Sequence, residues 1–477
     1  MRLKLAGFIV VAAFSLLAAQ GAFAADMPTK MPVKAAPMMA ATPWTGFYVN
    51  GGAGYGVWTA DETTLNAAGV CTTCETQYQG GKGWLGTIGA GYDYQFTDRI
   101  IVGLFGDASL SSLKGTIQDQ SNGGPNISGD IKQTSSWAFG ARGGWLVTPK
   151  TFTYFNAGYA GARFSSTNMV NLNIGAASAQ TTPAFTANGW FLGGGLETAV
   201  APNWFWRTEY RYAYYGSKTI AEAGPIVSSI TFKPAVQTVT SQIVYKFNGG
   251  IPTPVYPTTP EVATNWTGVY ANVGMGYGMW AANSTANNTG TTTCIVCGTQ
   301  VQGGKGYLGL VGAGYDWQFA PTWVAGVFGD FAISSLKGTI QDLNQNFSGS
   351  IKQSSAWAVG PRLGWLPNQQ TMIYGNGGYA GARFGSTNMV SANNSVSTGW
   401  TTPSFTANGW FAGGGVETTF NFWGMLGKGW FWRNEYRYAS YGNKTVTDLN
   451  GAGVPQADIA FKPVVQTFTS SVMFKFN

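Results

Sequence analysis

The chain contains 477 residues, of which 10% are charged and 68 are glycine, and its formal net charge is +7. A soluble domain usually carries about 25% charged residues and about 7% glycine, so this composition is poor in charge and rich in glycine. The absence of histidine excludes Ser-His-Asp and Cys-His catalysis, His-ligated metal sites and an imidazole pH switch. With 15% aromatic residues, the chain is predicted to be folded and β-rich, and it is long enough for two or more domains.

Residues 1–24 predict a cleaved secretory signal. Arg2 and Lys4 form a charged start, an apolar stretch covers 5–17, and 22–24 (AFA) is a small-residue cleavage site. The alternative is a transmembrane anchor. No later apolar run reaches the ~18 residues that a spanning helix needs. The Pro- and Ala-rich stretch 25–43 is expected to form a periplasmic tail.

The rest of the sequence consists of two similar copies joined by a linker. The segment SSLKGTIQD at 111–119 returns unchanged at 334–342, and the aromatic segment at 204–219 returns at 430–445 with three changes. A period above 200 residues indicates two whole domains, because solenoid repeats run about 20–50 residues. The predicted units are a first copy at 44–248, a Pro- and Thr-rich linker at 249–265 and a second copy at 266–477.

Within each copy, apolar and polar residues alternate with a period of two, which predicts β-strands. Turns of a few residues alternate with long loops rich in Asn, Thr, Ser and Gly. This alternation of short and long connections is typical of an outer-membrane barrel, which has its short turns in the periplasm and its long loops outside. A soluble sandwich does not require such an alternation. The strands predicted for the first copy are 45–60, 83–97, 99–114, 131–147, 151–165, 186–201, 204–217 and 232–248.

The segment 204–214 shows how the two faces of a strand differ. Its aromatic residues, including Trp204 and Tyr210, alternate with Arg207, Glu209 and Arg211. In an outer-membrane barrel the aromatic face contacts lipid and the charged face lines the lumen. The same alternation predicts further outward-facing residues: Trp84, Ile88, Tyr92, Val102, Leu104, Trp137, Phe139, Trp145, Trp190 and Leu192.

The inward faces are predicted to hold four acids and four arginines in each copy. Such residues line an ion-selective pore, or they pair with one another and fill the barrel. The equal numbers of acids and bases favour a closed salt-bridge network, and the glycine-rich inner faces suit a narrow lumen. The predicted network comprises Asp93, Asp107, Arg142, Arg163, Glu197, Arg207, Glu209 and Arg211 in the first copy, and Asp316, Asp330, Arg362, Arg383, Glu417, Arg433, Glu435 and Arg437 in the second.

All four cysteines, Cys71, Cys74, Cys294 and Cys297, lie in the first long loop of their copy. An exported chain meets an oxidising periplasm, so we predict one small disulfide in each loop. A bridge between the copies and a four-cysteine zinc site are alternatives.

The glycine run at 51–56 superficially matches a dinucleotide-binding loop, but it lies inside a predicted strand. No cofactor, no metal and no nucleic-acid partner is predicted. Some outer-membrane barrels are hydrolases that use a Ser-His or Asp-His pair, and this chain has no histidine. We therefore do not expect an enzyme.

Four segments of the first copy carry a family resemblance: WTGFYVNGGAGYG at 44–56, GAGYDYQF at 89–96, WRTEYRY at 206–212 and YKF at 245–247. Each copy resembles the opacity-porin-like family of small alphaproteobacterial outer-membrane β-barrels, which are related in architecture to OmpA. The resemblance implies an OmpA-type eight-stranded antiparallel barrel in the cell outer membrane, with a structural or porin-like role. Most members have one barrel, whereas this chain has two copies, and here Asn477 follows the final aromatic residue.

The fold expected from the sequence is therefore all-β: two tandem eight-stranded transmembrane antiparallel β-barrels. The alternative is one fused sixteen-stranded barrel. The expected function is a structural and surface role in the cell envelope, and the alternative is a porin for passive diffusion of small hydrophilic solutes. Expected partners are outer-membrane lipid and lipopolysaccharide, the outer-membrane assembly machinery, and ligands of unknown identity on host or neighbouring cells.

Overall fold

The computed structural model describes residues 44–119, 127–148, 150–172, 176–225, 228–247, 264–288, 294–342, 345–392, 394–419 and 428–476. The predicted signal, the predicted tail and all but the last two residues of the predicted linker lie outside these ranges. The described residues form antiparallel strands, which confirms the predicted all-β fold. None of the described residues belongs to a helix that is long and apolar enough to span a membrane.

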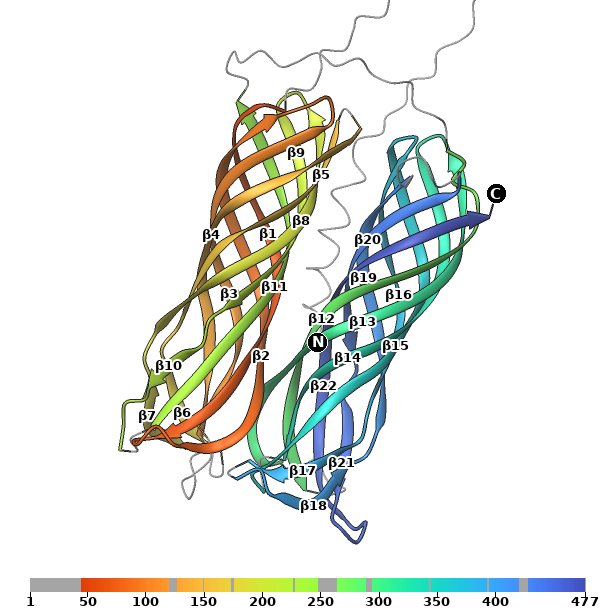
Figure 1. Cartoon of the computed structure of the whole chain (residues 1–477). Coiled ribbons are helices and arrows are strands. Elements are labelled where there is room, and N and C mark those ends of the chain that lie inside the picture. The colour runs from red at the N-terminus through yellow and green to blue at the C-terminus, as the bar shows by residue number, and fades with distance from the viewer. Residues whose placement is uncertain are drawn as a thin grey trace, which may run out of the picture. The chain divides into compact units, whose positions relative to one another are not determined.

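Eight long strands of the first copy pair in sequence order and then close into a ring, because β1 also pairs with β11 from Phe47↔Phe247 to Asn66↔Ser228. Figure 1 shows this ring in red to yellow-green. Three short strands, β6 (Thr167–Asn171), β7 (Ala177–Thr182) and β10 (Lys218–Ala221), extend its loops. The long strands are β1 (Gly46–Asn66), β2 (Cys71–Gln95), β3 (Ile100–Asp119), β4 (Ile127–Thr148), β5 (Thr151–Phe164), β8 (Phe185–Ala201), β9 (Trp204–Tyr215) and β11 (Ser228–Phe247).

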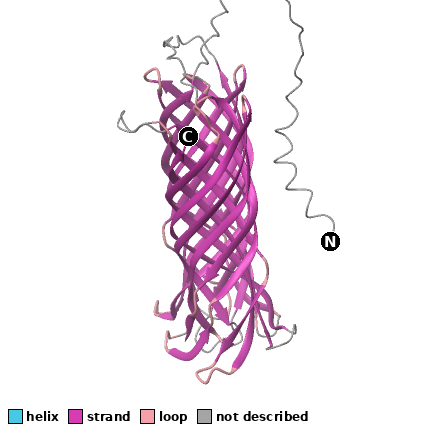
Figure 2. Ribbon diagram, turned by 90° about the vertical axis from the view of Figure 1, so that its right-hand side faces the viewer, coloured by secondary structure: helices cyan, strands magenta, loops and turns pink. Residues whose placement is uncertain are grey.

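The second copy repeats this arrangement, and β12 pairs with β22 from Val269↔Phe476 to Asn288↔Ala457. Its short strands are β17 (Thr387–Ser391), β18 (Ser397–Thr402) and β21 (Lys444–Leu449). Figure 2 shows the strands tilted along the barrel wall. The long strands are β12 (Gly268–Asn288), β13 (Cys294–Ala320), β14 (Trp323–Asp342), β15 (Phe347–Asn368), β16 (Thr371–Phe384), β19 (Phe405–Thr419), β20 (Trp430–Tyr441) and β22 (Pro455–Phe476).

The two ends of each barrel differ. The short connections, such as those from β2 to β3 and from β8 to β9, lie at one end, which we call the turn end. The short extra strands lie at the other end, which we call the loop end (Figure 1). Several long strands contain 20 or more residues, whereas a membrane-spanning strand needs about 9–11.

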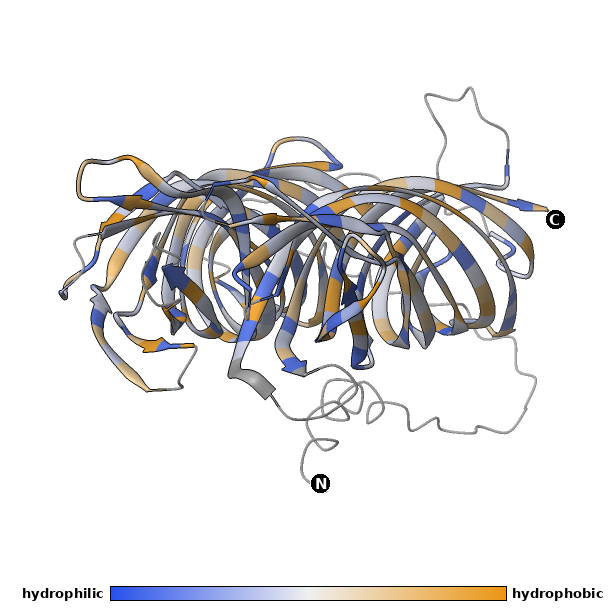
Figure 3. Ribbon diagram, turned by 90° about the horizontal axis from the view of Figure 1, so that it is seen from below, coloured by the Kyte–Doolittle hydropathy of each residue, from blue (hydrophilic) through white to orange (hydrophobic). Residues whose placement is uncertain are grey.

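The outward face carries a band of large apolar side chains that is about as tall as a membrane core. On β2 the band runs from Trp84 to Tyr94, and on β3 it runs from Ile100 to Leu110, so it covers eleven residues of each strand. The ten residues predicted to face outward are all exposed or half-buried. Figure 3 shows hydrophobic and hydrophilic residues alternating along the strands, as two different faces require.

The two copies belong to one compact unit, Ala41–Asn477. Near the loop end, β2 pairs with β3 only as far as Gly81, and β13 pairs with β14 only as far as Gly304. Just beyond these points Gln79 and Gln302 form a bridge between the two copies. The ends of β2 and β13 that separate from β3 and β14 therefore meet each other, while they stay paired with β1 and β12 of their own barrels.

The contacts between the copies are reciprocal. Gln77 Nε2 donates to Ser348 Oγ (3.1 Å), and the equivalent Gln300 Nε2 donates to Ser128 Oγ (2.8 Å). Two pairs of tyrosine rings follow the same rule and pack edge to face: Tyr55 with Tyr438 and Tyr212 with Tyr277. Equivalent surfaces that contact each other in this way form an isologous interface, as in a two-fold symmetric dimer.

Candidate functional site in the barrel lumen

The lumen of the first barrel holds a buried ion cluster near the turn end. Arg142 donates to both oxygens of Asp93, with Nε–Oδ1 at 2.8 Å and Nη2–Oδ2 at 2.5 Å. Arg142 Nη1 also donates to Glu197 (3.0 Å), and Arg207 Nη2 donates to the same carboxylate (2.7 Å). These side chains are 4% exposed or less. Charges removed from water in this way require close, hydrogen-bonded partners, and both carboxylates have them.

A second ion cluster lies further into the same barrel. Arg211 donates to both oxygens of Asp107, at 2.9 and 2.7 Å, and to Glu209 Oε1 at 2.7 Å. The Tyr154 hydroxyl donates to the other oxygen of Glu209 (2.8 Å). A guanidinium that binds a carboxylate with two parallel hydrogen bonds is fixed in orientation as well as position. Arg211 therefore holds two different strands of the wall together.

The second barrel repeats both clusters with its own residues. Its deep cluster joins Arg362 to Asp316 and Glu417, and Arg433 to Glu417. Its second cluster joins Arg437 to Asp330 (2.6 Å) and to Glu435 (2.7 Å). The structure thus brings fourteen of the sixteen sequence-predicted residues together in two equivalent networks.

The prediction was wrong for the remaining two residues, Arg163 and Arg383, which are exposed on the outward face. On β5 the even-numbered residues point inward, as the burial of Phe152, Tyr154 and Phe164 shows, so residue 163 points outward. Small residues lie on both faces of this strand, so its sequence does not show which residues face the lumen.

A lysine that sequence reasoning missed completes each deep cluster. Lys246 Nζ lies 2.5 Å from Asp93 and 3.1 Å from Glu197, and Lys475 Nζ lies 2.5 Å from Asp316. Both lysines are 1% exposed. The segment Tyr245-Lys246-Phe247 could have indicated this position from the sequence. Its two aromatic residues face outward, so the lysine between them must face inward.

Aromatic rings enclose the deep cluster. Arg142 lies 4.5 Å above the Tyr48 ring, and Lys246 lies 5.0 Å from the Trp44 ring, which are cation–π distances. Tyr48 can lie flat across the wall because Gly91 has no side chain: a Cβ at Gly91 would lie 2.4 Å from the Tyr48 hydroxyl. Glycine on the inner face therefore makes room for large side chains in the lumen.

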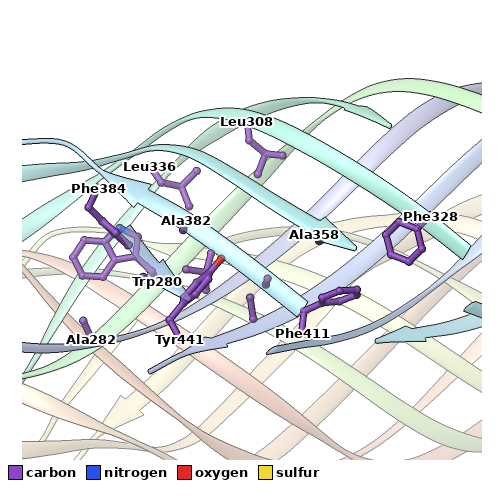
Figure 4. Packing of buried hydrophobic residues seen from close by; sticks show 14 of the residues in the cluster. Trp280, Ala282, Leu308, Phe328, Leu336, Ala358, Ala382, Phe384, Phe411 and Tyr441 are labelled. Atoms are coloured by element: carbon purple, nitrogen blue, oxygen red, sulfur yellow. The ribbon is translucent and has the colours of Figure 1, made fainter. Parts of the chain in front are cut away.

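The lumen is closed toward the loop end by an apolar layer. Phe232 contacts the rings of Trp58, Phe164 and Phe185, with centroids 5.6–5.7 Å apart. All four side chains are 7% exposed or less. The second barrel contains an equivalent layer that includes Trp280 and Phe384, shown in Figure 4. Sequence reasoning missed this layer because it assigned most of these segments to strand ends or loops.

A small cavity lies beside the second ion cluster of each barrel. The first barrel has a cavity of about 40 Å³ beside Arg211 and Gln242, and the second has one of about 60 Å³ beside Arg437. A site for a drug-sized ligand is about 300–1,000 Å³, whereas a buried water needs a cavity of only ~10–15 Å³. Each of these two cavities has room for a few water molecules and is far smaller than a site for a drug-sized ligand.

The cysteines offer no metal site among the described residues. Cys71 is disulfide-bonded, and no described cysteine is free. The side chains of Cys74, Cys294 and Cys297 lie outside the described residues. Within the described ranges, no group of three or more Cys, Asp or Glu side chains is arranged to hold a metal ion.

At the loop end, two carboxyl groups share a hydroxyl. Ser228 Oγ lies 3.0 Å from Asp119 Oδ2 and 2.6 Å from Glu222 Oε2. Burial raises the pKa of Glu222 to about 8, and a hydrogen bond with Asp119 adds to the rise. In the second copy, burial raises the pKa of Asp448 to about 7, and the charge of Asp342 adds to this rise. Both groups lie in connections beyond the apolar band.

Comparison with known proteins identifies the family. The model of the family described as "Outer membrane protein beta-barrel domain" matches the chain twice, at residues 9–247 and 253–476. The 31 kDa outer-membrane immunogenic protein of Brucella melitensis is 28% identical over 247 residues, which are 50% of this chain and 99% of that protein. The 25 kDa outer-membrane immunogenic protein of Brucella abortus is 30% identical over 248 residues, which are 51% of this chain and 99% of that protein.

Solved structures similar to the chain include Neisserial surface protein A, at 18% identity and a TM-score of 0.23, covering 43% of this chain and 98% of that one. A FadL homologue of Pseudomonas aeruginosa is 10% identical, with a TM-score of 0.28 and 91% of each chain covered. The family model and the Brucella relatives both describe outer-membrane proteins. The chain belongs to the outer-membrane β-barrel family, contains two copies of that domain and is located in the outer membrane.

Proposed function

We propose that this protein is a non-conducting structural protein of the outer membrane, built as two closed eight-stranded barrels that hold their loop ends at the cell surface. In this proposal the barrels act as anchors, and neither lumen carries solute or catalyses a reaction. The loop ends would contact ligands on host or neighbouring cells. The assembly machinery of the outer membrane would insert both barrels.

The observation that carries the proposal is the continuous filling of each lumen. Along β11 the inward residues change from Lys246 in the ion cluster, through Gln242 beside the small cavity, to Phe232 in the apolar layer. A solute would have to displace both the ion pairs and the aromatic layer. Removing one partner of a buried ion pair costs about 3–5 kcal/mol, so spontaneous opening would be rare.

The strand pairing supports two barrels over one fused barrel. β1 and β11 pair along 20 residues each, and β12 and β22 pair along the same length. A sixteen-stranded ring would require both of these pairings to break and two new pairings to form. Such a ring would enclose an aqueous channel, because porins of 16–18 strands do.

The names of the Brucella relatives describe outer-membrane immunogenic proteins, and this supports a role at the cell surface. The loop end provides the surface for it, because strands such as β2 and β13 continue well beyond the apolar band.

Conductance in planar lipid bilayers tests the proposal. The full chain, folded and inserted, should show no stable channels at voltages at which a general porin, as the positive control, conducts readily. A variant with Phe232→Ala and Arg211→Ala in the first barrel should conduct transiently if the filling blocks the lumen. Large, stable channels from the unmodified protein would reject the proposal and favour the porin alternative.

A further inference from the structure

The outward face of each barrel carries a row of lysines on three neighbouring strands. In the first copy, Lys82 on β2 lies directly opposite Lys114 on β3, and Lys114 lies directly opposite Lys132 on β4. Residues directly opposite each other in an antiparallel pair point to the same face, with Cβ atoms about 4.5–5.5 Å apart. Lys114 and Lys132 therefore share one exposed patch of surface, whereas Lys82 Nζ donates to Asn283 Oδ1 of the second copy (3.2 Å).

The second copy repeats the row. Lys305 on β13 lies opposite Lys337 on β14, and Lys337 lies opposite Lys352 on β15. Lys337 and Lys352 are exposed, as are Lys114 and Lys132 in the first copy. The same arrangement thus occurs twice in one chain.

Like charges placed directly opposite each other destabilise a sheet. Nearby negative charges must therefore offset the repulsion among the lysines of each row. In the first copy Lys114 pairs with Asp130 (2.6 Å), but both side chains are 62% exposed, and such pairs contribute little. The second copy has Ser350 where the first has Asp130. Among the described residues, neither Lys337 nor Lys352 forms an ion pair with an acid. Lys305 is already paired with Asp61 of the first copy (2.5 Å). For Lys337 and Lys352, which no acid of the described residues offsets, the compensating anion must come from outside the chain.

The position of the rows indicates the source of that anion. The exposed lysines follow the last large apolar residue of their strands toward the loop end: Lys114 follows Leu110, and Lys132 follows Trp137 on β4. Large aromatic residues at the end of a lipid-facing band mark the membrane–water interface. The lysine rows therefore lie at the level of the lipid headgroups in the outer leaflet.

The two arginines that do not face the lumen lie beside these rows. The backbone N–H of Ser165 donates to the carbonyl of Lys132, and Arg163 is two residues before Ser165. In the second copy, Gly385 pairs with Lys352 in the same way, and Arg383 is two residues before it. Arg163 and Arg383 are both exposed. Arginine binds phosphate oxygens with two parallel hydrogen bonds, so each row has a neighbouring guanidinium that suits the same ligand.

We propose that Lys114, Lys132 and Arg163 in the first copy, and Lys337, Lys352 and Arg383 in the second, bind the phosphate groups of an anionic lipid in the outer leaflet. The acyl chains of that lipid lie against the apolar band below, which contains Leu110 and Trp137. A free phosphate ion would gain only the first of these contacts, so the ligand is a phosphorylated lipid. The inference depends on the outer-membrane location and not on the closed lumen.

Binding of lipid A to the full chain in detergent tests the proposal. Lipid A with its phosphates intact should raise the melting temperature of the protein and remain bound in native mass spectrometry, whereas enzymatically dephosphorylated lipid A should do neither. Each lysine near an anionic surface contributes about 1 kcal/mol, or roughly fivefold in affinity. The variant K337Q/K352Q should therefore weaken binding roughly 25-fold. The matched variant K114Q/K132Q should have a smaller effect, because Asp130 already offsets part of that row.

The controls separate charge at this level from charge in general. R99Q/K150Q removes two cations at the turn end and should leave lipid A binding unchanged. In detergent without lipid, K337Q/K352Q should melt at the same or a higher temperature than the unmodified protein, because it relieves repulsion; this also shows that the variant folds. Millimolar inorganic phosphate should not reproduce the stabilisation by lipid A.

Three results would overturn the proposal. The first is equal binding of intact and dephosphorylated lipid A. The second is equal loss of binding in K337Q/K352Q and R99Q/K150Q. The third is full stabilisation by inorganic phosphate alone. None of these results bears on conductance, so the closed-barrel proposal stands or falls separately.

Discussion

Arg211 on β9 and Asp107 on β3 form a two-hydrogen-bond ion pair, at 2.9 and 2.7 Å, between strands on opposite sides of the first barrel. The pairing order around the ring places four strand steps between β3 and β9 in either direction. Arg437 and Asp330 form the same pair in the second barrel, at 2.9 and 2.6 Å. Each pair is therefore a cross-link through the lumen.

Removing one end of this cross-link should destabilise the barrel strongly. Arg211→Ala leaves Asp107 and Glu209 buried without their main partner, and the expected loss is about 3–5 kcal/mol of unfolding free energy. Arg163→Ala removes an exposed arginine and should change stability by no more than about 0.5 kcal/mol. Urea unfolding followed by heat-modifiable gel migration measures both. Equal stabilities of R211A and R163A would contradict the cross-link.

Glycine on the inner face should be far less replaceable than glycine on the outer face of the same strand. A Cβ at Gly91 would lie 2.4 Å from the Tyr48 hydroxyl, whereas a Cβ at Gly86 has its nearest neighbour, the Gly52 carbonyl oxygen, at 3.9 Å. Gly91→Ala should therefore displace Tyr48 from the ion cluster and cost about 1–3 kcal/mol, as overpacking does. Gly86→Ala should be nearly neutral, or slightly stabilising because alanine restricts the unfolded chain. Thermal unfolding of the two variants provides the comparison.

The loop end should become less stable as the pH rises through neutrality. The folded pKa of Glu222 is about 8, and the free value of a glutamate is ~4.3. Between these values the folded state holds a proton that the opened state releases, so its contribution to stability is complete below pH ~4.3 and is lost as the pH rises through 8. Asp448, with a folded pKa of about 7, adds a loss of the same sign at slightly lower pH.

The variant E222Q/D448N should remove most of this dependence between pH 5 and 9. Thermal midpoints followed by tryptophan fluorescence would measure it, with Asp98→Asn at the exposed turn end as the control. A variant that keeps the full slope of the unmodified protein would show that other groups are responsible.

The interface between the copies should hold without a covalent link. The side-chain amides of Gln118 and Gln341 donate to each other across it (3.1 and 3.0 Å), and both side chains are 1% exposed. With a protease site inserted at 249–263, the two halves should stay together in mild detergent after cleavage of the folded chain. Size-exclusion chromatography would show one species, and two species would contradict the interface.

Two double variants sharpen this test. Q118E/Q341E places two carboxylates in contact in a buried position and should separate the cleaved halves. Q118L/Q341L removes this pair without adding charge, although Gln300 and Gln77 each lose a donor, at about 1–3 kcal/mol each. This loss is smaller than that from two buried carboxylates in contact, so the halves should stay together. Gln456→Glu, outside the interface, is the matched control for the added charge.

Much of the fold could be predicted because its signals are local. The alternation in Trp204–Tyr215 indicates both the strand and its two faces, and repeated segments such as 111–119 and 334–342 indicate the duplication. The predicted loop at 61–82 is instead largely strand, since β1 extends to Asn66 and β2 begins at Cys71. That region carries polar residues on both faces, with Gln77 and Gln79 on one and Thr76 on the other. Contacts of Gln77 and Gln79 with the other copy replace the apolar face that the sequence lacks.

The sequence alone determined the fold class, the duplication and most of the inward charges, because each depends on periodicity within one strand or on identity between segments. Only the tertiary structure decided which charges meet. Lys246 reaches Asp93 across 153 positions of the chain, and that pairing depends on the register of the closed ring. The tertiary structure also placed Arg163 on the outer face, because small residues on both faces of β5 leave its alternation undefined in the sequence.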